Sequence, residues 1–164
     1  MDPWRAPQRV GNADLMNDCL MLKQFSRTTQ LIVVQPTSLC NLDCKYCYLP
    51  YRSRRNFMSR NVLTALGQNV CTSELIHPLV EVSFHSGEPL LAGLDWFEDA
   101  IHYLAGSWPA GMTASYSVQT NATLIDDKWA QLFKERKIRV SVSVDGPQHV
   151  NDYNRRNWGA WDLC

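Results

Sequence analysis

Two kinds of hydrophobic pattern alternate along the chain. Short runs rich in β-branched and aromatic residues predict strands, and they span residues 31–35, 80–84, 115–119 and 138–144. Longer segments with apolar residues three or four positions apart predict helices, and they span residues 59–75, residues 94–104 and a stretch that begins at Asp126 or Asp127. Strands joined by such helices favour a parallel sheet with right-handed crossovers. We therefore expect an α/β fold with about four parallel strands and crossover helices.

Each predicted helix has one apolar face, and core packing is the expected role of that face. Ser59 is a candidate N-cap for the first helix, and Asp126 or Asp127 for the third, where an aspartate also suits the positive end of the helix dipole. The apolar residues of the first helix are Val62, Leu63, Leu66 and Val70. Those of the second are Trp96, Phe97, Ile101 and Leu104, and those of the third are Trp129, Leu132 and Phe133.

Length and charge narrow the classes of function. A chain of 164 residues is expected to form one compact domain at residues 29–164, after a poorly defined leader at 1–28. Lys and Arg total 16 and Asp and Glu total 16, so no net field would recruit nucleic acid or an anionic membrane. No apolar run approaches the roughly 20 residues of a membrane span, and no secretory signal is recognisable. We expect a cytoplasmic protein.

Three of the six cysteines lie within eight residues, at Cys40, Cys44 and Cys47. Cytosolic thiols stay reduced, so clustered cysteines indicate a metal site. The C-x3-C-x2-C spacing is typical of an iron-sulfur cluster, in which three thiolates leave one iron open for chemistry. Zinc is one alternative, and it would need a fourth ligand such as Asp43 or His85. The other alternative is that the three cysteines bind no metal and pack in the core. The other cysteines, Cys19, Cys71 and Cys164, are expected to have packing or solvent-exposed roles.

Polar segments follow all four predicted strands. They are residues 37–40, 85–89, 120–123 and 145–147. Since ligands of parallel α/β proteins gather at the carboxyl ends of the strands, these segments predict one site assembled from four loops.

The cysteine motif after a first strand, followed by these loops, resembles the radical S-adenosylmethionine superfamily. The resemblance implies the N-terminal part of a partial (β/α)6 barrel in which Cys40, Cys44 and Cys47 hold a 4Fe-4S cluster. It implies that the amine and carboxylate of S-adenosylmethionine bind the open iron. An electron donor then reduces the cluster, and a 5'-deoxyadenosyl radical abstracts hydrogen from a substrate.

Further cofactor-binding residues follow from the same resemblance. The segment Ser86, Gly87, Glu88 and Pro89 is similar to the motif that holds the methionyl amine, with Ser86 where glycine or alanine is usual. Gly87 would let the backbone approach the ligand, Pro89 would stiffen the turn, and the Glu88 carboxylate or the adjacent backbone would meet the amine.

The resemblance also implies contacts to the other parts of the ligand. The position of Tyr46 lies near the adenine in the family, that of Ser143 lies near the carboxylate or ribose, and Asn121 is a weaker candidate. Packing for Tyr46 and local capping for Ser143 and Asn121 stay open, and so do a structural and a ligand-contacting role for His85.

Three segments, residues 31–37, 119–125 and 143–147, are similar to those of the peptide-modifying branch, which includes sulfatase maturases, and residues 35–50 are most similar to the cyclophane-forming peptide maturases. The resemblance covers roughly residues 29 to 157. The implied substrate is a side chain of a ribosomal precursor peptide or protein. The barrel is expected to be truncated and the cysteine-rich SPASM domain absent. A fragment, an interrupted gene product and half of a split enzyme completed by a second chain stay open, as does a catalytically inactive iron-sulfur or zinc-binding module. No acid or base acting on the substrate can be assigned.

Overall fold

A computed structural model describes residues 28–159 of the chain. The elements in order are β1 (Thr29–Val34), α2 (Arg60–Ala65), the π-helical turn η1 (Leu66–Val70), β2 (Ile76–Phe84), the 3-10 turn η2 (Pro89–Ala92), α3 (Leu94–Ser107), β3 (Thr113–Thr120), α4 (Asp127–Glu135), β4 (Arg139–Val142) and α5 (Gln148–Asn154). Cys19, Cys164 and nearly all of the predicted leader lie outside the described residues.

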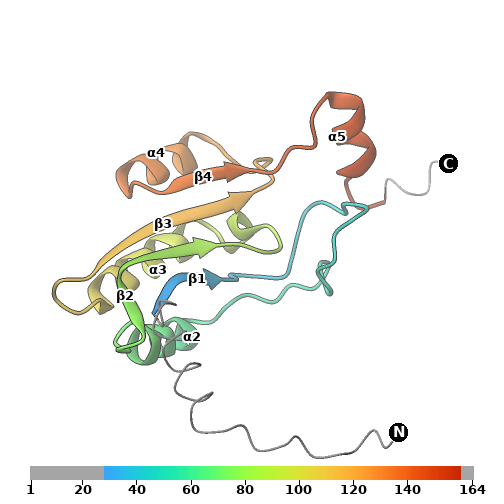
Figure 1. Ribbon diagram of the computed structural model, residues 1–164. Coiled ribbons are helices and arrows are strands. Elements are labelled where there is room, and N and C mark those ends of the chain that lie inside the picture. Colours follow the sequence, from blue (N-terminus) through green and yellow to red (C-terminus); the bar gives the residue numbers. More distant parts are fainter. Residues whose placement is uncertain (1–27, 160–164) are drawn as a thin grey trace, which may run out of the picture.

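The four strands form one parallel sheet in the order β1-β2-β3-β4 (Figure 1). Every neighbouring pair is joined through a helical crossover, as the alternating sequence pattern predicted. The predicted parallel α/β fold is therefore confirmed.

One face of the sheet forms the hydrophobic core. Val82 of β2 pairs with Ile32 of β1 and with Tyr116 of β3, so these three neighbouring side chains lie on this face. Helices α3 and α4 cover it through stacked aromatic rings: the Phe97 centroid lies 4.9 Å from that of Phe84 and 5.2 Å from that of Trp129. The predicted apolar faces of the second and third helices are confirmed, since Phe97, Ile101, Leu104, Trp129, Leu132 and Phe133 are buried and Trp96 packs against the core.

The predicted first helix is wrong in length and partly in orientation. The α-helix ends at Ala65 and continues as the π-helical turn η1, and β2 begins at Ile76, four residues before its predicted start. Gly67 in η1 packs closely against α3, because a Cβ there would lie 2.6 Å from both Ser107 Oγ and Tyr103 Cε1. The two helices thus approach at a point where only glycine fits. Val62, predicted to face the core, is 49% exposed.

The capping predictions have different outcomes. Ser59 occupies the N-cap of α2, but its side chain makes no capping hydrogen bond. Asp126 caps α4 as predicted, by accepting a hydrogen bond from the backbone nitrogen of Trp129 at 3.0 Å.

Two further differences concern the end of the described chain. Strand β4 has four residues rather than the predicted seven, and α5 was not predicted because its seven residues carry little apolar periodicity. No helix among residues 28–159 is long and apolar enough to cross a membrane.

Candidate functional site

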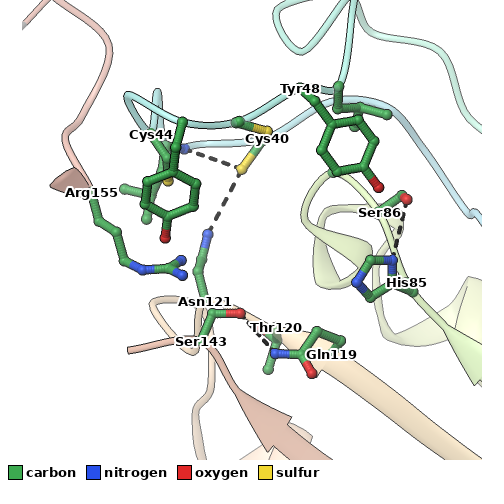
Figure 2. A pocket seen from close by; sticks show the side chains of 15 residues that line it. Cys40, Cys44, Tyr48, His85, Ser86, Gln119, Thr120, Asn121, Ser143 and Arg155 are labelled. Carbon is green, nitrogen blue, oxygen red and sulfur yellow. Dashed lines mark hydrogen bonds between the residues drawn. The ribbon is translucent and has the colours of Figure 1, made fainter. Parts of the chain in front are cut away.

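Loops that follow all four strands line one cavity of about 210 Å³ at the carboxyl edge of the sheet (Figure 2). Its lining includes eight of the ten residues predicted as ligand-binding: Cys40, Cys44, Cys47, Tyr46, Ser86, Gly87, Asn121 and Ser143. The other two, Glu88 and Pro89, are buried and do not line it. The assignment of these ten residues to ligands stays a prediction, but their gathering at one edge agrees with the strand-end rule.

The cysteine loop is held from outside by side chains and backbone of later segments. The Arg52 guanidinium donates to the Cys44 carbonyl oxygen at 3.2 Å and pairs with Asp43 at 2.8 Å. The Trp158 indole donates to the Cys40 carbonyl oxygen at 2.8 Å. The Lys45 backbone nitrogen donates to the carbonyl of Asn154, the last residue of α5, at 2.9 Å. These contacts leave the thiols on the cavity side of the loop.

The donor set fits an iron-sulfur cluster. Burial raises the pKa values of both the Cys40 and the Cys44 thiol above the ordinary cysteine value, and the Arg155 guanidinium opposes this rise at Cys44. Cys40 Sγ accepts hydrogen bonds from the Leu42 backbone nitrogen at 3.4 Å and from Asn121 Nδ2 at 3.9 Å. Hydrogen bonds to cysteine sulfur are one of the means by which proteins tune such clusters.

The geometry does not offer a ready site for a single metal ion. Within residues 28–159, no three His, Cys, Asp or Glu side chains converge as ligands of one ion. The proposed fourth zinc ligands have other contacts, since Asp43 pairs with Arg52 and His85 Nδ1 lies 3.3 Å from Ser86 Oγ. The thiols instead border a space of about 210 Å³, more than ten times the roughly 10–15 Å³ that one water molecule needs.

Gly87 allows two loops to meet. Its φ of +60° lies in the left-handed region, and an added Cβ would lie 2.6 Å from the carbonyl oxygens of both Thr37 and Leu39. The next residue, Glu88, donates its backbone N–H to the Leu39 carbonyl oxygen at 2.8 Å. The close approach that the glycine permits is therefore to the segment leading into Cys40, in addition to its exposure to the cavity.

The Glu88 carboxylate is turned into the protein and joins two loops. Oε1 accepts from the Leu90 backbone nitrogen at 3.1 Å and from Thr120 Oγ1 at 2.7 Å, and Oε2 accepts from the Asn121 backbone nitrogen at 2.8 Å. Desolvation raises the pKa of this carboxyl, while the three hydrogen bonds oppose the rise. Of the two groups predicted to meet the amine, the backbone beside Glu88 faces the cavity and the carboxylate supports it from behind.

Polar side chains from β3 and the segment after β4 line the cavity opposite the thiols (Figure 2). Gln119 Nε2 donates to Ser143 Oγ at 2.7 Å, and Asn121 Nδ2 donates to Asn41 Oδ1 at 2.8 Å. His85, left open by the sequence, lines the same cavity. Asn121 thereby connects the cysteine loop with the end of β3.

Thr120, in the predicted loop 120–123, lines the cavity, whereas sequence reasoning missed Gln119, Tyr48 and Arg155. Gln119 could have been found, because it lies two positions before Asn121 and strand side chains alternate. Arg155 could not, because it follows the unpredicted helix α5.

Arg155 belongs to a hydrogen-bonded group with Asp145 and Tyr46. Its Nε donates to Asp145 Oδ1 at 2.9 Å, and the Tyr46 hydroxyl contacts both carboxylate oxygens at 2.9 Å. Desolvation opposes these bonds, but they hold the pKa of Asp145 below its ordinary value. Desolvation and the bond to Asp145 raise the pKa of Tyr46 to about 12. The tyrosine therefore stays a hydroxyl donor at neutral pH.

A parallel sheet with three thiols and a cavity at its carboxyl edge defines an α/β protein with a candidate cofactor site. The model of the Radical SAM superfamily matches residues 34–162. The chain belongs to the radical SAM superfamily.

Known proteins with similar sequence and structure include peptide-modifying enzymes. The serine-type anaerobic sulfatase-maturating enzyme of Bacteroides thetaiotaomicron is 32% identical over 139 residues, which are 81% of this chain and 33% of that protein. The structure of anSMEcpe with bound AdoMet and Cp18Cys peptide has a TM-score of 0.70 at 33% identity, over 79% of this chain and 35% of that one. This chain thus spans about a third of the length of the relatives it matches.

A more distant structure shares the fold. Streptococcus suis SuiB bound to precursor peptide SuiA has a TM-score of 0.59 at 17% identity, over 94% of this chain and 34% of that one. The four-stranded sheet and its helices therefore correspond to the N-terminal part of the radical SAM fold.

Proposed function

We propose that this chain is the cofactor-binding part of a radical SAM enzyme that modifies a peptide side chain in the reducing cytoplasm. The observation that carries the proposal is that three thiols line one cavity together with residues of two further predicted loops, 85–89 and 120–123, and with Ser143 after β4. When bound there, a 4Fe-4S cluster and S-adenosylmethionine supply a 5'-deoxyadenosyl radical for hydrogen abstraction.

The residues of this chain then bind and orient. Cys40, Cys44 and Cys47 hold three irons, and the backbone of Ser86 and Gly87 receives the methionyl amine. Glu88 keeps that turn in place through its bonds to Thr120 and to the Asn121 backbone nitrogen. Ser143, Asn121 and Tyr46 contact the remaining parts of the ligand from the other three loops.

The relatives support a peptide or protein substrate. One is named as a sulfatase-maturating enzyme, and two structures hold a peptide, Cp18Cys in anSMEcpe and SuiA in SuiB. A one-electron donor is the second partner, because the cluster must be reduced before each radical forms.

Cluster loading is the direct test. After anaerobic reconstitution with iron and sulfide, we expect about three to four irons per chain and a reduced-cluster paramagnetic resonance signal that changes when S-adenosylmethionine is added. Cys44→Ala should lose the cluster. Cys71→Ala is the matched control, because Cys71 is a fully buried thiol that does not line the cavity. Stoichiometric zinc without iron uptake, or equal loss of iron in both variants, would contradict the proposal.

Radical chemistry is tested separately from binding. The reduced, fully loaded chain should release 5'-deoxyadenosine, measured by chromatography. A fully loaded preparation that binds S-adenosylmethionine yet releases none would favour the inactive cluster-binding module.

A further inference from the structure

Asp145 lies between two cavity-lining side chains that come from distant parts of the chain. Tyr46 belongs to the cysteine loop, and Arg155 follows α5. The Asp145 carboxylate accepts from Arg155 Nε at 2.9 Å and from the Tyr46 hydroxyl at 2.9 Å. Asp145 itself does not line the cavity. Its carboxylate therefore acts on the cavity through its two partners.

We propose that Asp145 is a positioning residue that fixes the Tyr46 ring and the Arg155 guanidinium on the wall of the cofactor cavity. The proposal rests on the function proposed above, because it assumes that the cavity holds S-adenosylmethionine beside the cluster.

The two partners need such a constraint for different reasons. Tyr46 is 55% exposed, so burial alone does not select one orientation of its ring. The Arg155 side chain is long and rich in rotamers, so ordering it costs conformational entropy. A charge-assisted hydrogen bond to a single carboxylate restricts both side chains before the ligand arrives.

The position of Asp145 is itself fixed by the turn into α5. Gly146 has a φ of +92°, which reverses the chain directly after Asp145. The Asp145 backbone nitrogen donates to Asn151 Oδ1 of α5 at 3.3 Å, and the Arg155 backbone nitrogen donates to the Asn151 carbonyl oxygen at 2.7 Å. Asn151 thus links both members of the ion pair through one helix.

The chemistry at the wall suits the proposed ligand. Among the described lining residues, Arg155 is the one Lys or Arg, and no Asp or Glu lines the cavity with it. A fixed guanidinium would favour an anionic group of the ligand, and a fixed aromatic ring would favour a flat one. Releasing both groups should therefore weaken ligand binding and leave the thiols in place.

Asp145→Asn tests the assignment on the reconstituted full chain. We expect iron content within about twofold of the wild type and a dissociation constant for S-adenosylmethionine raised about tenfold, measured by anaerobic equilibrium dialysis with the labelled compound. The change in the reduced-cluster resonance signal on adding S-adenosylmethionine should weaken in parallel. Glu98→Gln, which neutralises an exposed carboxylate on α3 outside the cavity lining, is the control and should change neither quantity.

Tyr46→Phe keeps the ring and removes only its bond to Asp145, so it covers the case in which Asp145→Asn folds poorly by circular dichroism. It should raise the dissociation constant about threefold, and the double variant should cost less than the product of both single effects. An unchanged dissociation constant in both variants, or a parallel loss of iron, would overturn the assignment. A wild-type chain that takes up no iron would instead defeat the function proposed above, and the assignment with it.

Discussion

The two faces of the sheet differ in chemistry although the same strands form both. The face under α3 and α4 carries Val82, Phe84 and Val118, each at most 1% exposed. The opposite face carries Glu81, Ser117 and Arg139, joined by a hydrogen bond of 2.6 Å and an ion pair of 2.6 Å. Parallel strands buried on both faces read as continuous apolar runs, so the polar face marks the side on which these strands border solvent and the ligand cavity.

That polar face leads into the site. His85 follows β2, Gln119 lies near the end of β3 and Ser143 follows β4, and all three line the cavity. The covered face therefore supplies stability, and the polar face supplies residues that line the cavity. The comparison predicts that substitutions on the two faces will affect different measurements.

The largest effect on stability is expected under the helices. Phe97→Ala removes a fully buried ring that contacts Phe84 and Trp129, and it should lower the free energy of unfolding by about 3–5 kcal/mol. Leu31→Ala is the matched control on the polar face, where Leu31 is 52% exposed, and it should change stability by about 0.5 kcal/mol or less. Urea unfolding followed by circular dichroism measures both, and equal losses would show that the two faces are not energetically distinct.

A smaller effect on stability is expected at Glu88, which is buried behind the cavity. The Glu88 carboxylate accepts from three donors: the backbone nitrogens of Leu90 and Asn121 and the Thr120 hydroxyl. Glu88→Gln keeps one accepting oxygen and replaces the other by an NH₂ group, which faces at least one of these donors. We expect a loss of about 2 kcal/mol, as for a buried donor left unsatisfied. Unfolding at neutral pH measures the loss, and an unchanged midpoint would mean that the amide finds other partners.

The smallest effect on stability is expected at the ion pair between Glu81 and Arg139 on the polar face. The hydrogen bond from Ser117, followed by contacts with Arg139, lowers the pKa of Glu81 below its ordinary value of 4.5. A carboxyl with a lowered folded pKa contributes stability above its unfolded pKa and loses that contribution as pH falls through the folded pKa. Glu81→Gln should therefore cost less than about 1 kcal/mol at pH 7, and the difference from the wild type should vanish in acid. A difference that persists below the folded pKa would contradict this assignment.

The sequence predicted the architecture because the pattern of the core is periodic. The apolar positions of α3 and α4 recur at helical spacing, and the polar segments follow strands at fixed places, so the parallel fold and the single site could be inferred. Relations between distant segments could not. Gly67 lies where η1 packs against α3, and Arg155, which follows α5, lines the cavity and bonds Asp145. Neither contact leaves a periodic signal in the chain.

The close fit at Gly87 bears on how the cysteine loop is anchored. The contacts of this turn with Thr37 and Leu39 join backbone to backbone and involve no thiol. The junction between the turn after β2 and the entrance of the cysteine loop therefore rests on backbone atoms, so it does not depend on the identity of the Leu39 side chain.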